Sequence, residues 1–162
     1  MEISRKTDYA IRLLAELVKS GDAIVSVRCA AENSDVPYSF ARSIQHDLVQ
    51  AGIVSSVRGS HGGMKLSVDA RKITLRNIIE SIQGPTCFDT CDTKETNKEG
   101  RPLVSNYAFD AVWCEADRIL KDYFSAVTLY QLVIEQRYPR LRHGHDFAAL
   151  TQDEYAAIAE GA

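Results

Sequence analysis

Apolar residues in the first fifty positions recur with the spacing of helices. Between positions 7 and 20 they lie three and four residues apart, which predicts a helix that ends at Gly21. The apolar residues of this face are Ala10, Leu13, Leu14, Leu17 and Val18. Ser26 is a good N-cap for a second, shorter helix over positions 27–33. The inward residues of that helix would be Val27 and one of the alanines at 30 and 31.

A third helix is predicted after a tight turn at positions 34–37, and it ends at Gly52. Its apolar and polar residues separate onto two opposite faces. The expected inward face holds Phe40, Ile44, Leu48 and Ala51. The expected outward face holds Ser39, Arg42, Ser43 and His46. This helix is therefore amphipathic, with a polar face rich in hydrogen-bonding groups.

Two short segments with strand character then flank a glycine-rich sequence. Positions 53–58 and 64–68 are joined by Gly-Ser-His-Gly-Gly at 59–63, which predicts a β-hairpin. Thr74 can cap a fourth helix that ends at Gly84, which Pro85 follows. The apolar residues of that helix are Leu75, Ile78, Ile79 and Ile82.

The second half of the chain begins with polar residues and continues with one long helix. Positions 87–102 show no apolar period and are predicted to form a loop. From about position 107 an apolar stripe predicts a long helix, with members Ala108, Val112, Ala116, Ile119, Leu120, Tyr123 and Val127. Thr128 is predicted to cap a last core helix that reaches Tyr138. The remaining tail is polar, although Thr151 and Glu154 fit a capping box for one more short helix.

Three short helices followed by a hairpin are the parts of a winged helix-turn-helix domain. The predicted fold class is therefore mainly α with a small β-hairpin wing, in which a winged helix-turn-helix domain precedes a long dimerisation helix. We expect the DNA-binding domain at 1–84 and a cysteine-bearing sensor loop at 85–106. The dimerisation helix and the following core helix would occupy 107–138, and the polar C-terminal tail 139–162.

The outward face of the third helix suits the reading of bases. In this fold the second helix of the turn enters the major groove, where Arg42 can bind guanine O6 and N7 together. Ser39, Ser43 and His46 add donors and acceptors without bulk. An ordinary solvated helix face would explain these residues equally well if the helix stood alone.

The hairpin suits contact with phosphates. Its glycines let main-chain N–H groups approach a phosphate, and three basic or imidazole side chains surround them, namely Arg58, His61 and Lys65. The glycines lack the spacing of a nucleotide-binding P-loop. A simple hairpin turn explains them in isolation, but the order of helices and hairpin favours DNA binding.

Composition changes this picture in two ways. No stretch among the 162 residues approaches the ~20 apolar residues of a membrane helix, and the charged start does not match a signal peptide. We therefore expect a cytoplasmic protein of one domain with an appended element and no membrane partner. The net charge of −3 divides into +2 for positions 1–86 and −5 for 87–162. The acidic excess thus lies outside the predicted DNA-binding half.

Four cysteines are too few for a disulfide scaffold, so in a reducing compartment a cluster of them favours metal or redox chemistry. Cys87 and Cys91 fall in the predicted loop, where exposed thiols without a role would be a liability. Cys114 could serve either as a metal ligand or as a buried apolar residue, and both alternatives stay open. Cys29 is expected to pack in the core. Two histidines in the polar tail, at 143 and 145, are expected to be solvated.

Four segments resemble one known family. They are TDYAIRLLAEL from position 7, AGIVSSVRGSHGGMKLS from 51, ITLRNIIESIQGP from 73, and AVW with VTLYQLV near the end. They resemble the Rrf-two family of bacterial winged-helix regulators, which includes the iron–sulfur regulator IscR, the nitric-oxide sensor NsrR and the cysteine-metabolism repressor CymR. The resemblance spans roughly positions 1–136 and is most specific over 51–67. It implies a homodimer that is held by the long helix and binds a pseudo-palindromic operator in double-stranded DNA.

The resemblance also implies ligands for an iron–sulfur cluster. Cluster-binding members carry three cysteines in the loop before the long helix, and here Cys87 and Cys91 occupy that loop. Tyr107 stands at the place of the usual third cysteine, which makes Cys114 the remaining thiol candidate. Thiolates suit thiophilic iron.

Two carboxylates are implied as further ligands. Asp110 stands where one family pattern places a histidine ligand, and Asp8 matches a position that supplies a carboxylate to the cluster of the partner subunit. An oxygen ligand leaves the cluster with a labile corner suited to sensing. Asp8 can equally be a charge that complements the dipole of the first helix.

The sequence thus predicts a homodimeric transcriptional regulator, not an enzyme, that senses iron–sulfur, nitric oxide or redox status through a Cys-ligated cluster. One alternative is a regulator of the same fold without any cluster, acting through a Cys87–Cys91 disulfide or a protein partner. Another is a metal-dependent enzyme built around these two cysteines and Asp110. No acid–base pair with a nucleophile accompanies them, which disfavours the enzyme.

Overall fold

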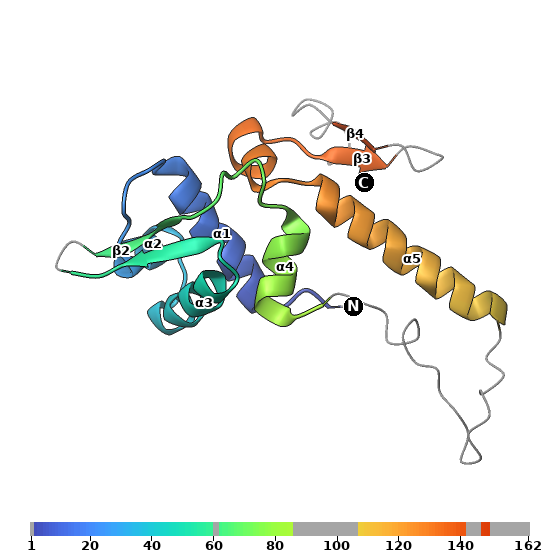
Figure 1. Ribbon diagram of the computed structural model, residues 1–162, viewed down its shortest axis with the longest axis horizontal. Coiled ribbons are helices and arrows are strands. Elements are labelled where there is room, and N and C mark those ends of the chain that lie inside the picture. The colour runs from blue at the N-terminus through green and yellow to red at the C-terminus, as the bar shows by residue number, and fades with distance from the viewer. Residues whose placement is uncertain (1, 60–61, 86–106, 142–146, 150–162) are drawn as a thin grey trace, which may run out of the picture.

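The computed structural model describes residues 2–59, 62–85, 107–141 and 147–149. The elements are α1 (Arg5–Lys19), α2 (Val27–Asn33), α3 (Tyr38–Gln50), β1 (Val54–Val57), β2 (Gly63–Leu66), α4 (Leu75–Gln83), α5 (Tyr107–Ala126), the π-helical turn η2 (Gln131–Glu135), β3 (Pro139–Leu141) and β4 (Phe147–Ala149). Figure 1 shows α1 to α4 and the β1–β2 hairpin gathered into one unit, here called the winged module, from which α5 extends. Within these described ranges no helix is long and apolar enough to cross a membrane. The mainly α fold with the β1–β2 hairpin as its wing confirms the predicted class.

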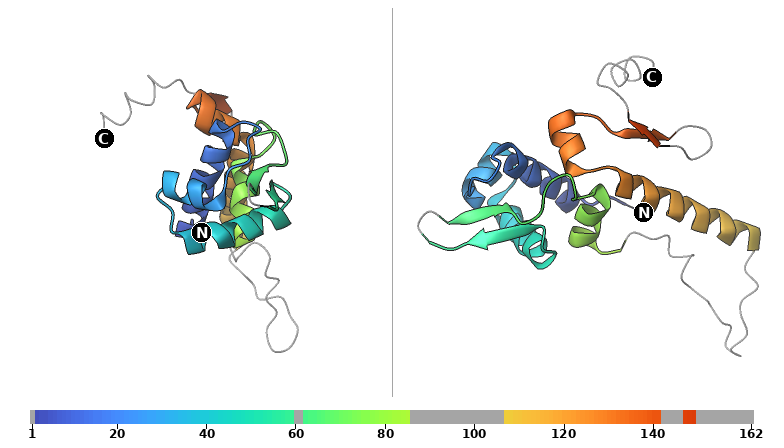
Figure 2. Two further views of the ribbon diagram at one scale, coloured as in Figure 1. Left: turned by 90° about the vertical axis from the view of Figure 1, so that its left-hand side faces the viewer. Right: turned by 45° about the horizontal axis from the view of Figure 1, so that its top comes forward.

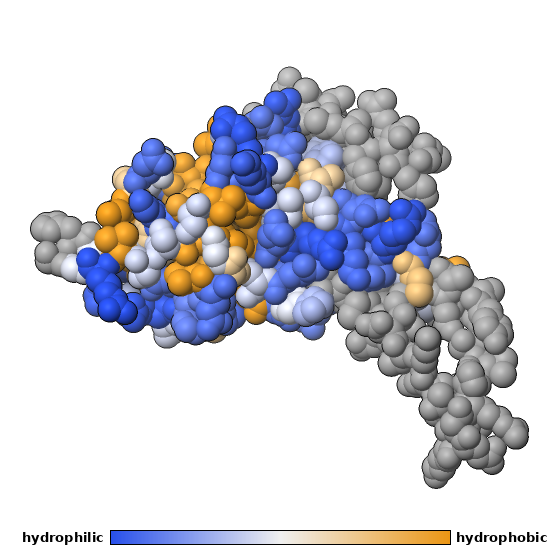
Figure 3. All heavy atoms as spheres, viewed as in Figure 1, coloured by the Kyte–Doolittle hydropathy of each residue, from blue (hydrophilic) through white to orange (hydrophobic). Residues whose placement is uncertain are grey.

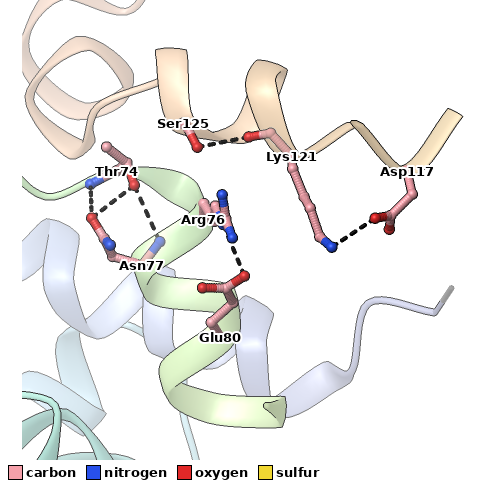
Figure 4. Close-up of polar contacts among 7 residues, drawn as sticks. All are labelled: Thr74, Arg76, Asn77, Glu80, Asp117, Lys121 and Ser125. Carbon is pink, nitrogen blue, oxygen red and sulfur yellow. Dashed lines mark hydrogen bonds and ion pairs between the residues drawn. The ribbon is translucent and has the colours of Figure 1, made fainter. Parts of the chain in front are cut away.

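Side chains determine where three helices of the winged module begin. Ser4 Oγ accepts a hydrogen bond from the Thr7 N–H at 3.2 Å, so α1 begins before the predicted position 7. Ser26 caps α2 in the same way, as predicted. Thr74 and Asn77 form a reciprocal capping box at the start of α4: the Thr74 N–H donates to Asn77 Oδ1 at 3.0 Å, and the Asn77 N–H donates to Thr74 Oγ1 at 3.2 Å (Figure 4). Local sequence alone therefore determines these helix starts.

One apolar core holds the winged module together. Its large buried side chains come from α1, α3, β2 and α4 and from the segment after α5, and include Leu13, Leu14, Leu17, Ile44, Leu48, Met64, Ile78 and Leu129. The removal of this apolar surface from water is the main term that stabilises the module.

The chain returns to this core directly after α5. The Leu129 N–H donates to the Ile73 carbonyl at 2.8 Å, and the Leu75 N–H donates to the Val127 carbonyl at 2.8 Å. Val127 and Leu129 are 1% and 0% exposed. Residues 127–130 therefore complete a core that the sequence pattern builds from the first 84 residues.

The chain after Val127 differs from the prediction. Thr128 does act as a cap, because its hydroxyl accepts a main-chain N–H at 3.2 Å, but it starts a π-helical turn that ends at Glu135, not a helix that reaches Tyr138. Gln136 then adopts a left-handed φ of 50°, which ends the turn. Beyond it β3 pairs antiparallel with β4, a pairing that the polar tail did not predict. The predicted capping box at Thr151 lies outside the described residues.

Candidate nucleic-acid interface

The outward face of α3 carries the four side chains predicted to contact bases. Ser39, Arg42, Ser43 and His46 are all exposed, so the structure places them together on one helix surface. Arg42 Nη1 donates a hydrogen bond to Gln45 Oε1 at 3.4 Å, which ties the guanidinium to its own helix. Hydroxyl, guanidinium and imidazole groups on one surface offer the donors and acceptors that read base edges in a major groove.

The inward face of α3 is rotated relative to the prediction. Ile44 and Leu48 are buried as expected, but Phe40 is 43% exposed and Ala51 lies exposed just beyond the helix. The buried residues of α3 are Ala41, Ile44, Gln45 and Leu48. Phe40 packs edge-on against Tyr9 of α1, with ring centroids 5.5 Å apart. An aromatic pair at the rim of the core thus replaces the expected full burial.

The hairpin that follows α3 carries two exposed cations. Lys65 lies in β2 opposite Ser55 of β1, and Arg58 directly follows the end of β1. His61, the third predicted wing residue, lies outside the described residues. Because β1 follows α3 closely in the chain, the hairpin stays next to that helix, and it projects away from α5 (Figure 2, right). Two features of a winged DNA-binding surface therefore lie side by side.

Two hairpin glycines are required by packing. A Cβ on Gly63 would collide with the Val25 carbonyl, and one on Gly62 would collide with the Val57 carbonyl. Met64, next in β2, exchanges main-chain hydrogen bonds of 2.8 and 3.0 Å with Val25, which fastens the wing to the chain ahead of α2. The sequence predicted these glycines for a hairpin turn or for main-chain approach to phosphates, and it did not indicate this bridge, because the bridge joins residues far apart in the chain.

Arg28 is an exposed cation that the sequence analysis did not assign. Its guanidinium carbon lies 5.2 Å from the ring centroid of Tyr38, the first residue of α3. This cation–π contact places a positive charge at the N-terminal end of the helix that is expected to enter the groove. The contact has no signal in the sequence, because the two positions match no helix or strand period.

The candidate cluster ligands are divided between the described ranges and the rest of the chain. Cys87, Cys91 and the side chain of Asp110 lie outside the described part. Cys114 is exposed on α5 and is therefore not part of the apolar core of this chain. Asp8 is exposed and forms an ion pair of 2.8 Å with the arginine one turn later. Among the residues that the structure describes, no three His, Cys, Asp or Glu side chains gather as a metal site.

Cys29 is exposed, so the prediction that it packs in the core is wrong. The 7-residue α2 buries Val27, Ala30 and Ala31 and turns Cys29 outward, where Asn33 Nδ2 lies 3.7 Å from its Sγ. Several small apolar residues follow one another in this helix, and only the packing against its neighbours decides which of them face inward.

α5 has an apolar groove along one side. The residues that line it are Val112, Glu115, Ala116 and Ile119. Val112 is 64% exposed. The face of α5 visible in Figure 3 is largely hydrophilic, so the helix is amphipathic. Its hydrophilic residues are paired along the helix: a hydrogen bond with Glu115 raises the pKa of Arg118 above its ordinary value.

A polar helix face beside a cationic hairpin, on a winged helix-turn-helix module, defines a winged-helix transcriptional regulator. The sequence model of the Rrf2 (Rrf-two) family, described as an iron-dependent transcriptional regulator, matches residues 3–135. The chain therefore belongs to the Rrf2 family, which confirms the resemblance. Family membership also supports a regulator in preference to a metal-dependent enzyme.

Individual relatives agree in sequence and in fold. A protein of Aquifex aeolicus assigned as an HTH-type transcriptional regulator is 28% identical over 142 residues, which cover 85% of this chain and 96% of that protein. The structure of CymR, the global cysteine regulator of B. subtilis, matches with a TM-score of 0.66 and 25% identity over 82% of this chain and 96% of CymR. IscR of T. potens shares the fold, with a TM-score of 0.64 and 22% identity over 84% of this chain and 88% of IscR.

Proposed function

We propose that the protein is a homodimeric regulator that binds a pseudo-palindromic operator in double-stranded DNA and responds to a Cys-ligated iron–sulfur cluster. The observation that carries the DNA part is the exposed polar face of α3 together with the exposed cations of the adjoining hairpin. A helix with such a face enters the major groove, and the wing lies along the DNA backbone. Because the proposed binding partner is operator DNA in a bacterial cell, we place the protein in the cytoplasm.

The side chains divide by chemistry into base readers and phosphate binders. Arg42 donates two hydrogen bonds from its guanidinium to O6 and N7 of one guanine. Arg58 neutralises a phosphate, because a cation at the wing meets the backbone and not a base edge. The remaining base-face contacts come from Ser39, Ser43 and His46, and the remaining wing contacts from His61 and Lys65.

The open groove of α5 supports a homodimer. Val112 is 64% exposed, and the groove continues through Ala116 and Ile119 on the same side of the helix. The α5 helix of a second copy presents the same apolar groove, so two copies can cover each other around a twofold axis. A dimer with two α3 helices then reads two half-sites of one operator.

Residues of two subunits would hold the cluster. The loop thiols Cys87 and Cys91 supply two thiolates, and Cys114, Asp110 and, from the partner copy, Asp8 are the candidates for the remaining positions. An exposed Cys114 and an exposed Asp8 fit this set, because both can reach a ligand at the surface without unfolding a core. When bound, such a cluster supplies an iron centre sensitive to oxidants and nitric oxide. The family description as iron-dependent supports it.

A ligand at Asp8 has a physical route to the DNA site. Lys6 lies two residues earlier in α1, and its Nζ is 2.6 Å from Asp47 Oδ2 of α3. A displacement of the first turn of α1 can therefore reach α3, because the two helices are joined by this ion pair. A ligand changes DNA affinity only by the difference in its binding free energy between DNA-competent and incompetent arrangements.

A second candidate keeps the DNA site and replaces the cluster by a Cys87–Cys91 thiol switch or a protein partner. Tyr107 at the place of the usual third cysteine favours it. The structural similarity to CymR, a cysteine regulator, also favours it.

The DNA part is tested by substituting the two arginines. Arg42→Ala should cost ~1–3 kcal/mol of operator binding and relax base preference at one position of each half-site. Arg58→Ala should weaken operator and random DNA alike and reduce the salt dependence by about one unit per lost phosphate contact. Lys19→Ala, at the exposed last residue of α1 and outside the proposed contact residues, is the control and should leave binding unchanged. Equal losses on operator and random DNA for Arg42→Ala would refute base reading.

The cluster part is tested on anaerobically purified protein. Cys87→Ala or Cys91→Ala should abolish the visible absorbance and change operator affinity, because two thiolates are the core of the ligand set. Cys29→Ala is the control and should leave both unchanged. Asp8→Ala should leave an unusually labile cluster in an intact dimer, because an oxygen ligand binds iron most weakly in this set. Colourless, iron-free protein after reconstitution, with both loop thiols free to titrate, would replace the cluster by the thiol switch.

A further inference from the structure

Gln45 is a buried polar side chain in the middle of the inward face of α3. It is only 8% exposed, beside Ile44 at 0% and Leu48 at 1%. A buried amide costs free energy unless its donor and acceptor groups are hydrogen-bonded. The bonds that Gln45 makes therefore explain its presence where an apolar residue would otherwise pack.

Both ends of the Gln45 amide have a partner. Its Oε1 accepts from Arg42 Nη1 at 3.4 Å, and its Nε2 donates to Ser56 Oγ of β1 at 3.4 Å. A guanidinium offers donors only, so the amide oxygen must face Arg42 and the amide nitrogen must face Ser56. The chemistry of the two partners thus fixes the orientation of the amide. Gln45 joins the candidate base reader on α3 to the first strand of the wing.

We propose that Gln45 is a positioning residue for DNA recognition, which orients the Arg42 guanidinium and holds α3 against the wing. The inference rests on the proposed reading of a base by Arg42. A long arginine side chain loses rotamer freedom when it binds a base, and a bond made before binding lowers that cost. The bond to Ser56 sets the spacing between the groove-reading helix and the strand that leads to Arg58. Gln45 thereby affects specificity without touching DNA.

The test uses the full-length protein and a randomised double-stranded DNA library, followed by single-base variants of the enriched duplex. Gln45→Leu keeps the approximate volume and removes both bonds. It should reduce discrimination roughly fivefold to tenfold at the half-site position that Arg42→Ala affects, as expected for the loss of about one hydrogen bond. Gln45→Leu combined with Arg42→Ala should be no worse than Arg42→Ala alone, because the positioned group is gone. Ser56→Ala should give a smaller loss at that position.

Gln83→Leu is the matched control. Gln83 also bridges two elements, because its Oε1 accepts from the Ser4 N–H at 3.1 Å and the Thr7 hydroxyl at 2.8 Å, but it joins α4 to α1. This substitution should lower the Tm and leave base preference unchanged. If Gln45→Leu does not fold, Gln45→Met replaces it, because its flexible side chain fits the same space without the amide.

The possible outcomes separate this inference from the function beneath it. Unchanged base preference in Gln45→Leu, together with altered preference in Arg42→Ala, overturns the positioning role and leaves base reading intact. A uniform loss on all duplexes, as for a purely structural defect, also overturns it. Unchanged preference in Arg42→Ala refutes base reading, and the positioning role falls with it.

Discussion

The winged module buries large apolar side chains in its core, whereas α5 leaves apolar side chains exposed to solvent. In the module, side chains such as Leu14 and Ile44 are 0% exposed, whereas Val112 on α5 is 64% exposed. The module covers its core with its own helices and hairpin, but α5 leaves an apolar groove open along one side. The difference teaches that the DNA-binding half is complete within one chain, while the long helix has a face suited to a second copy.

The two regions are nevertheless connected by more than a linker. Residues 127–130 follow α5 and contribute Leu129 to the core of the winged module. A displacement of α5 therefore also shifts residues in the core against which α3 packs. This continuity gives a physical path by which a change at α5 reaches the DNA-binding face.

The largest effect is expected from charges placed in the α5 groove. Val112→Asp together with Ile119→Asp should give a monomeric or insoluble chain, because two carboxylates cannot be buried against the same groove of a partner. Sedimentation measures the oligomeric state. Operator affinity should fall steeply, since each monomer reaches only one half-site.

Ser125→Asp is the control for this pair. Ser125 is exposed on α5, and helix geometry places it on the side opposite Val112. It should leave the oligomeric state unchanged. A double aspartate variant that remained a well-folded dimer would contradict the proposed interface and erase the contrast between the two regions.

The next largest effect, on the free energy of unfolding, is expected at Leu129, which connects the end of α5 to the core of the winged module. Leu129→Ala should lower the free energy of unfolding by about 2–5 kcal/mol, because a fully buried leucine leaves a cavity. Urea unfolding of the winged module measures this loss. Ile134→Ala, at a 48% exposed position of η2, should cost less than about 1 kcal/mol. Equal small losses would show that residues 127–130 do not belong to the core.

The smallest effect is expected from the cap of α4. Thr74→Ala should cost about 1 kcal/mol, because it removes the hydroxyl that accepts the Asn77 N–H (Figure 4). Thr74→Ser keeps the hydroxyl and should restore most of this loss. The measurement is a shift in Tm. Equal destabilisation by both substitutions would assign the effect to the lost methyl group instead of the capping box.

Short-range features of the fold could be predicted from the sequence. Ser26 and Thr74 cap α2 and α4 as predicted, and the hairpin lies between α3 and α4 as expected. Caps and turns depend on atoms a few residues apart, so their signals are contained in the local sequence. The exposed face of α3 could be predicted for the same reason, because helix periodicity separates Arg42 and His46 from Ile44.

Other features depended on contacts that no local pattern contains. Cys29 was expected inside and is exposed, because the packing of α2 against its neighbours selected its alanines for the core. Phe40 was expected inside and instead pairs with Tyr9 at the rim. The burial and bridging role of Gln45 were not predicted, because its two partners come from different elements.

The sequence by itself determined the order of the elements as far as α5, the caps of α2 and α4 and the chemistry of the outward face of α3, because each rests on spacing along one segment. Only the tertiary structure decided that residues 127–130 complete the core, that Gly63 must be glycine to pass the Val25 carbonyl, and that Gln45 bridges α3 to the wing. These contacts join residues that are distant along the chain. Their free energy arises only when the folded module excludes water and brings their surfaces together.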